Sequence, residues 1–341
     1  MIKKGIALIG NTIVDELVPI LEPGQLSYVD ANKFVSEEEL KGEKIKFSVG
    51  GMALNVGVDL AKIGGSYPVG VFGKVGRDHQ AELIHESLQM NHLDSGHLIV
   101  DENNETSRTE VLHFKLHDGK IERVFRHVLG AMGSFDENEV QIEKIAQYKI
   151  AMLGYGLLLP KFDFEDEKYG TKTGKVLSNL QKLGVQTCID FISPSKENLF
   201  KFYRYRKTIK YVDICCINED QADALTGLQK PEQACKALVD KLGAKVAIVH
   251  CGAEGPNYAY TKQDGLLIQE NFRIAEKDYK GNAGAGDAFT SGILHGIHEG
   301  WALADALKFA SAAAAISLRD ISCTGAMQSE QFILEFINAN L

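Results

Sequence analysis

Hydrophobic runs of strand length alternate with stretches of helical periodicity along most of the chain. Apolar runs such as YPVGVFGKVG, KIAMLGYG, VQTCIDF, VDICCIN and KVAIVHCG are separated by segments with apolar residues every three or four positions. Among these segments are a helix that begins near Asp78 and a helix that ends near Gly184. The alternation predicts repeated strand, helix, strand units, and therefore an α/β fold with a mostly parallel sheet covered by helices.

Two segments, residues 12–48 and 97–130, break this rhythm and are typical of extended, hairpin-rich sequence. The second contains two alternating runs, TEVLHFKLHDGKIERVFRHV, on either side of an Asp118-Gly119 turn. We predict that both segments form one small β-sheet that the chain enters twice. The expected division is an α/β domain of residues 1–11, 49–96 and 131–341, with residues 12–48 and 97–130 as the appended sheet.

The stretch KGNAGAGDAFTSGIL, residues 280–294, combines a nearly bare backbone with one carboxylate, Asp287. Helical spacing of apolar residues begins directly after it, so Gly284-Ala285-Gly286 is predicted at a helix N-terminus. Free amides and the positive end of the helix dipole favour an anion there, often a phosphate. An Asp in the first turn can also simply cap its helix, and this motif alone does not separate the two interpretations.

Composition narrows the possible partners. The chain has 341 residues, 45% of them hydrophobic and 24% charged, and a formal net charge of −9 without a long basic run, so no nucleic-acid partner is expected. The apolar stretch near the start ends at Ile9, and the apolar segment 309–318 is far below the roughly 18 residues that span a bilayer, so we expect a cytoplasmic protein with no membrane partner. Ten histidines and six cysteines show no metal-ligand spacing, and no metal site held by the protein alone is expected.

Several motifs, in a fixed order, resemble the ribokinase (PfkB) family of carbohydrate kinases. The segment 281–287, GNAGAGD, resembles the family signature D-T-x-G-A-G-D, and GGMALNVGVDLAKIGG resembles its N-terminal signature. GNTIVD is similar to the segment with a sugar-binding aspartate, GKVGRD to the pattern G-x-V-G-x-D, and FASAAAAISLRD to the late alanine-rich helix. The matches extend from about residue 5 to 326, which is more specific than any single motif.

The resemblance implies a fold and an activity. The fold would be the three-layer ribokinase-like one, a central mostly parallel sheet between helices, with the small β-sheet as a lid. The activity would be transfer of the γ-phosphate of ATP, with Mg²⁺, to a hydroxyl of a sugar, in a homodimer that covers the exposed strand edges of the lid. A nucleoside kinase of the same family and a catalytically impaired sugar- or nucleotide-binding regulatory protein stay open as alternatives.

The resemblance also implies roles for individual residues. Asp287 would be the general base, and the amides of Gly284, Ala285 and Gly286 would form the anion hole for the γ-phosphate. Two further sets are expected to bind the sugar (Asn11, Asp15, Gly50, Gly51 and Asn55) and the nucleotide (Asn218, His250, Gly252, Gly255 and Ser311). Turn, cap or strand-end roles stay open for several of them, and Arg108 and Arg123 are expected on a solvated strand face.

The sequence departs from the family pattern at four positions. Gln221 replaces the glutamate of N-x-x-E, which weakens the metal environment unless Glu219 or Asp220 compensates. His250 and Ser311 replace residues usual near the nucleotide, and Gly281 replaces the first aspartate of D-T-x-G-A-G-D. Potassium-activated members use that aspartate, so we expect that magnesium is required here and potassium is not.

Overall fold

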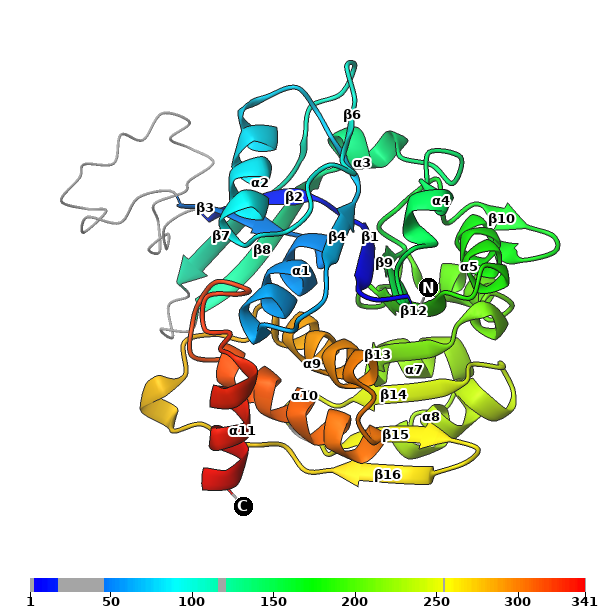
Figure 1. Ribbon diagram of the computed structural model, residues 1–341, viewed down its shortest axis with the longest axis vertical. Coiled ribbons are helices and arrows are strands. Elements are labelled where there is room, and N and C mark those ends of the chain that lie inside the picture. The colour runs from blue at the N-terminus through cyan, green and yellow to red at the C-terminus, as the bar shows by residue number, and fades with distance from the viewer. Residues whose placement is uncertain (1–2, 18–45, 116–120, 254, 341) are drawn as a thin grey trace.

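The computed structural model describes residues 3–17, 46–115, 121–253 and 255–340. Eight strands form the central sheet, in the order β16 (Gly265–Gln269), β15 (Asn257–Thr261), β14 (Val246–His250), β13 (Ile214–Asn218), β12 (Gln186–Phe191), β9 (Ile150–Gly156), β1 (Ile6–Gly10) and β4 (Val69–Phe72) (Figure 1). All neighbours from β4 to β14 are parallel. At one edge, β15 runs in the opposite direction, and β16 pairs antiparallel with it. The predicted mostly parallel sheet is confirmed.

Helices cover both faces of this sheet because successive strand residues point to opposite sides. In β1, Ala7 and Ile9 enter one core cluster, while Ile6 and Leu8 enter the other. Helices on the first side are α5 (Lys172–Lys182), α6 (Leu199–Tyr205), α7 (Glu219–Thr226) and α8 (Pro231–Asp240). Helices on the second side are α1 (Met52–Ile63), α2 (His79–Met90), α9 (Ala285–Glu299) and α10 (Leu303–Ser317).

Short elements complete the α/β part. The last helix, α11 (Glu330–Ala339), packs against α10 through a third, smaller core that includes Phe309 and Ile333. The remaining elements are α3 (Gly130–Ser134), α4 (Ile142–Ile145), two 3₁₀ turns (Ile209–Tyr211 and Glu276–Asp278) and the strand pairs β5 (Lys74–Val75) with β6 (Ile99–Val100) and β10 (Glu165–Asp166) with β11 (Gly170–Thr171).

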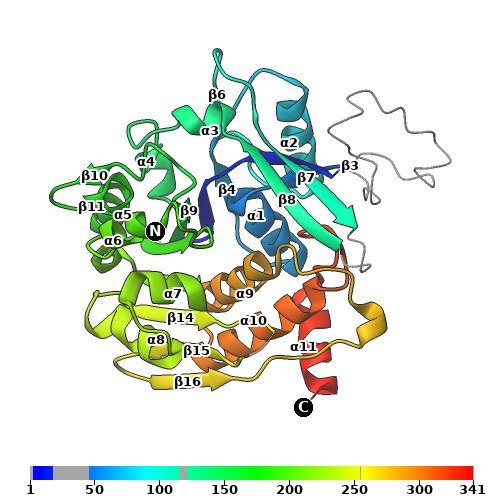
Figure 2. The ribbon, with the colours of Figure 1, turned by 180° about the vertical axis from the view of Figure 1, so that it is seen from behind.

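A separate four-stranded sheet projects beside α1, at the end of the molecule away from β14 to β16 (Figure 2). Its order is β3 (Lys46–Gly50), β2 (Ile13–Leu17), β7 (Ser107–Lys115) and β8 (Ile121–Val128). These strands come from the two segments that interrupt the α/β rhythm, whereas Ile99–Val100 pairs with β5 instead. The Asp118-Gly119 turn lies outside the described residues, and the division into an α/β domain and a lid stays a prediction.

Both predicted helix limits are confirmed. Asp78 caps α2, because its Oδ1 accepts a hydrogen bond from the amide of Ala81 at 2.9 Å. The helix α5 ends just before Gly184, whose φ of 72° is easily adopted only by glycine. Within the described ranges, the helices are all too short or too polar to cross a membrane.

Candidate active site

The site is built around the start of α9. The helix begins at Ala285, and Gly284 caps it in the left-handed conformation, with φ 76°. A Cβ atom on Gly284 would lie 2.3 Å from the carbonyl oxygen of Cys323, so both backbone conformation and space require glycine here. The predicted helix N-terminus at this motif is confirmed. Its first turn lies beside His250 of β14 and Tyr155 of β9.

Asp287 lies in the first turn of α9 and is 5% exposed. Its Oδ2 accepts a hydrogen bond from Nδ2 of Asn55 at 2.9 Å, and its Oδ1 accepts one from the hydroxyl of Tyr155. Burial raises the pKa of Asp287 to about 6, while the two hydrogen bonds oppose the rise. A carboxylate with this pKa can accept a proton near neutral pH and can lose it again.

The predicted sugar-binding residues meet at the start of α1. A Cβ atom on Gly50 would lie 2.2 Å from Oδ2 of Asp15, so the carboxylate rests against bare backbone. Gly51 caps α1 with φ 82°, and a Cβ there would lie 2.5 Å from the carbonyl oxygen of Asn11. Because Asn55 follows one turn later and bonds Asp287, this group lies directly beside the carboxylate of α9.

Asp15 belongs to a polar row across the four-stranded sheet. It lies opposite Thr109, which lies opposite His127 on the next strand. Thr109 hydrogen bonds Asp15, and its Oγ1 is 3.0 Å from Nδ1 of His127. Burial raises the pKa of Asp15 to about 6, against the hydrogen bond from Thr109, and the charge of Asp287 adds to the rise.

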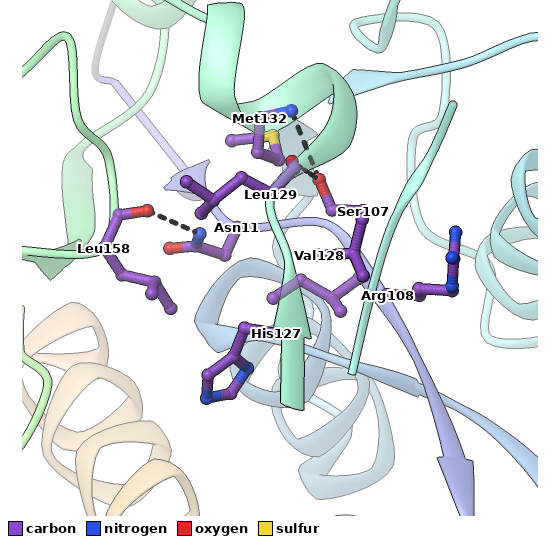
Figure 3. Close-up of a pocket in the computed structure, with 9 residues that line it drawn as sticks. Asn11, Ser107, Arg108, His127, Val128, Leu129, Met132 and Leu158 are labelled. Atoms are coloured by element: carbon purple, nitrogen blue, oxygen red, sulfur yellow. Dashed lines mark hydrogen bonds between the residues drawn. The ribbon is translucent and has the colours of Figure 1, made fainter. Parts of the chain in front are cut away.

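Asn11 braces the loop after β9. Its Oδ1 accepts a hydrogen bond from the amide of Tyr155 at 2.9 Å, and its Nδ2 donates to the carbonyl of Leu158 at 3.3 Å (Figure 3). Both polar atoms of the Asn11 side chain are therefore bonded to backbone groups, and the bond to Tyr155 helps to fix the position of that residue. Figure 3 shows the guanidinium of Arg108 turned away from Asn11. Arg108 forms an ion pair with Glu105 at 2.6 Å. The side chain of Arg123 lies outside the described residues.

On the nucleotide side, His250 lies next to the start of α9. A Cβ atom on Gly286 would be 3.5 Å from Cε1 of His250, and the imidazole also packs against Phe289 with ring centroids 5.1 Å apart. Burial lowers the pKa of His250 to about 4, so the ring is neutral at physiological pH. Asn218 is its neighbour across the β13 and β14 pair.

Two asparagines that the sequence patterns did not single out hold the other nucleotide-side residues together. Nδ2 of Asn271 donates to the carbonyls of Gly252 and Gly255, at 2.6 Å each. Nδ2 of Asn257 donates to Oδ1 of Asn271 at 2.8 Å and to Oγ of Ser311 at 3.3 Å. The glycine loop after β14 is thereby tied to α10.

The side chain of Gln221 forms hydrogen bonds that stabilise the local fold. It forms a reciprocal capping box with Asn218 at the start of α7, at 2.9 Å and 2.8 Å. Its Nε2 also donates to the carbonyl of Phe191 at 2.5 Å, a bond that a glutamate carboxylate has no N–H to make. The nearest buried carboxylate is Asp190, whose pKa is raised well above its usual range by burial and by the charge of Asp287.

Tyr155 and Asp190 are site residues that the sequence patterns missed, although a signal was present. Each stands at the carboxyl end of a predicted parallel strand, in KIAMLGYG and VQTCIDF. The crevice of an α/β sheet lies beyond these ends, so the last polar residue of each run was a candidate.

The comparisons with known proteins agree with this architecture. The model of the family described as "pfkB family carbohydrate kinase" matches residues 24–330. A 5-dehydro-2-deoxygluconokinase from Clostridium botulinum is 24% identical over 330 residues, covering 94% of this chain and 92% of that protein. The structure of Arabidopsis thaliana ribokinase complexed with ribose and ATP superposes with a TM-score of 0.76 at 21% identity, covering 99% of both chains. A putative ribokinase II from E. coli, in complex with ATP and Mg²⁺, superposes with the same TM-score of 0.76 at 16% identity, covering 99% of this chain and 100% of that one.

The match to the family covers most of the chain, and the fold is that of the ribokinases. The chain therefore belongs to the pfkB family of carbohydrate kinases, phosphotransferases that act on a sugar hydroxyl.

Proposed function

We propose that this kinase transfers the γ-phosphate of ATP to a hydroxyl of a sugar, with Asp287 as the general base. The observation that carries the proposal is the buried carboxylate of Asp287 on the first turn of a helix that begins with only glycine and alanine. The sugar oxygen forms a bond to the γ-phosphorus, the bond from that phosphorus to the β,γ-bridging oxygen breaks, and the sugar proton passes to Asp287.

The start of α9 fits the phosphate that this reaction needs. The residues at the start of the helix are glycine and alanine, and the positive end of the helix dipole favours the negative charge of the transition state. We assign the amides of Gly284, Ala285 and Gly286 to this anion hole. The loop with Gly252 and Gly255, held by Asn271, would carry the rest of the nucleotide, beside His250 and Ser311.

A divalent ion fits this site only together with the phosphates of ATP. Among residues with described positions, no three His, Cys, Asp or Glu side chains gather closely enough to hold a metal. Mg²⁺ commonly takes one or two carboxylates plus substrate phosphates, and Asp190 and Glu219 are the carboxylates that this chain offers near Asn218. The ion would neutralise charge on the phosphates as the bond breaks.

The structural role of Gln221 weighs against an impaired regulatory protein. Its amide fixes the start of α7 and the end of β12, so its presence has an explanation that leaves Asp287 and the glycine cradle intact. Loss of a carboxylate at position 221 is therefore no sign of lost catalysis.

A coupled assay of ADP release over hexoses, pentoses, sugar acids and nucleosides tests the proposed function. The sugar acids should include 5-dehydro-2-deoxygluconate, for which the clostridial relative is named. We expect turnover with one class of sugar. Fastest turnover with a nucleoside would support a nucleoside kinase, and sugar or ATP binding by calorimetry without any turnover would support the regulatory alternative.

We also propose a homodimer through the four-stranded sheet. Its edge strands are β3 and β8, and unpaired strand edges tend to be covered by another chain. Sedimentation at micromolar concentration should give a dimer, and a monomer throughout that range would contradict this assembly.

A further inference from the structure

Asp59, on α1, is a fully buried carboxylate without a bonding partner. It is 0% exposed, and neither of its carboxylate oxygens has a hydrogen-bond partner among the described residues. Asn55 lies four residues earlier, on the same face of the helix. Its Oδ1 is also buried without a described partner, while its Nδ2 donates to Asp287. Three acceptor oxygens thus lie on one helix face with no donor assigned to them.

The charges that face Asp59 do not compensate it. Burial raises the pKa of Asp59 well above its usual range, and the negative charge of Asp287 on α9 adds to the rise. Lys62, on the same helix, opposes this only weakly, and its ammonium donates to the carbonyl of Thr324 at 2.7 Å.

The strands packed against α1 add no described counter-charge. The strands β1 and β4 have the sequences IALIG and VGVF, which contain no charged residue, and the titratable residue of β9 is Tyr155. The strand β3 contributes Lys46, whose side chain lies outside the described residues. Burial of an ionised, unpaired carboxylate in such a place is strongly unfavourable.

A proton satisfies all of these constraints, and a metal ion does not. A cation needs several ligands, and the described residues hold no group of three metal-binding side chains. A proton on one oxygen of Asp59 turns that oxygen into a donor, and the acceptor one turn away is Oδ1 of Asn55.

We propose that Asp59 is a neutral acid that donates its proton to Oδ1 of Asn55 and thereby fixes the orientation of the amide that binds Asp287. Asp59 is a positioning residue, and the proposal rests on Asp287 being the general base. Without the donor, the amide of Asn55 can turn by half a rotation. Its Oδ1 would then face the carboxylate of Asp287, which repels it.

Two substitutions of similar volume separate this role from packing. Asp59→Leu fills the space but donates nothing, and we expect kcat to fall about tenfold, the usual size of losing one buried hydrogen bond. Asp59→Asn restores a donor toward Oδ1 of Asn55, and we expect it to recover most of that loss. In an Asn55→Ala background, Asp59→Leu should have little further effect, because Asp59 acts through Asn55. Equal losses in Asp59→Leu and Asp59→Asn would overturn the proposal.

The acid limb of the pH profile gives a second readout. A neutral Asp59 exerts no charge on Asp287, so the limb of kcat/KM should lie at the same pH in Asp59→Asn and in the wild-type enzyme. If Asp59 were ionised, its removal would shift the limb downward by about half a pH unit or more, as neighbouring carboxylates do. Such a shift would contradict the proposal.

Infrared difference spectroscopy tests the proton without reference to activity. At neutral pH, the difference between the spectra of the wild-type protein and Asp59→Leu should contain the C=O stretch of an un-ionised carboxyl, shifted in D₂O, and the difference with Asp59→Asn should contain it too. The band of Asp190, whose pKa is also raised well above its usual range, cancels in both differences. Asp213→Asn is the matched control: Asp213 is a buried carboxylate at the opposite end of β13, bound by Thr187 and paired with Lys245. It should change neither the un-ionised band nor the acid limb. If the band is present but Asp287→Asn keeps full activity, the assignment of the base fails and the protonation of Asp59 stands.

Discussion

Asp287 has a buried position, which favours its neutral form, whereas the proposed role as general base requires its charged form. We expect Asp287→Asn to lower kcat by about 10²- to 10⁴-fold, the usual contribution of a positioned base, with little change in the KM for sugar. If the variant kept more than about a third of the wild-type turnover, the loss would be far smaller than removal of a general base normally causes. Asp287 would then have only a capping role.

The same substitution should also change how stability depends on pH. The folded pKa of Asp287 is about 6, above its usual 3.8, so its stabilising contribution is complete below 3.8 and is lost as pH rises through 6. The difference corresponds to roughly 3 kcal/mol. An asparagine does not ionise, so the unfolding temperature of Asp287→Asn relative to wild type should be higher at about pH 8 than at about pH 4.5. Calorimetry at both values measures it, and a difference that does not change with pH contradicts it.

The acid limb of the wild-type enzyme should report two carboxyls. The pKa values of Asp15 and Asp287 are both raised to about 6, mainly by burial. If both must be ionised, log kcat/KM falls with a slope steeper than one as pH drops below 6. Asp15→Asn should leave a single-proton limb at lower catalytic efficiency. A slope of one in the wild-type enzyme would mean that the ionisation of only one of them matters.

At the scale of elements, a lysine of α1 reaches the loop after α10. Gly281 brings no carboxylate, and the ammonium of Lys62 donates to the carbonyl of Thr324 in the loop that packs on Gly284. A fixed positive charge therefore already lies on one backbone carbonyl of this loop. We therefore expect turnover to be the same with potassium and with choline at constant ionic strength, in the presence of magnesium. A rise of about fivefold or more with potassium would show a site for a hard cation despite Gly281.

Elements and their limits were largely predictable from the sequence, because they depend on local chemistry. Asp78 caps its helix with its own side chain, and Gly284 marks a helix start through the left-handed backbone that it adopts. Strand neighbours were not predictable in the same way, since β9 lies between β1 and β12 only once the whole sheet is assembled.

The same distinction applies to the site. Asp287 is part of a local motif, and the sequence patterns predicted it. Gln221 resembles a defect until its bond to the carbonyl of Phe191, thirty positions earlier, is seen. Asp59 lies on α1, a helix that is buried along most of its length, and this burial follows from the assembled fold and not from a local motif.

At the scale of the molecule, the chain passes directly from β1 of the central sheet into β2 of the four-stranded sheet. We expect that closure of this sheet over a bound sugar excludes water from the phosphate. Hydrolysis of ATP without acceptor should therefore be slow compared with sugar phosphorylation, by about 10²-fold or more if a bound acceptor is needed to complete the site. ADP release with and without the best sugar measures this ratio, and similar rates would mean that the sheet does not gate the reaction.

The two-residue connection between β1 and β2 gives such closure a mechanical consequence. Asn11 and Thr12 are 1% and 0% exposed, and Thr12 is held by the carbonyl of Lys74, so the joint between the sheets is buried and not a free linker. Oδ1 of Asn11, in this connection, accepts a hydrogen bond from the amide of Tyr155, and the hydroxyl of Tyr155 donates to Asp287. A movement of the outer sheet that displaced Asn11 would therefore reach the proposed proton acceptor through two hydrogen bonds, and an open enzyme would have both an unshielded site and a misaligned carboxylate.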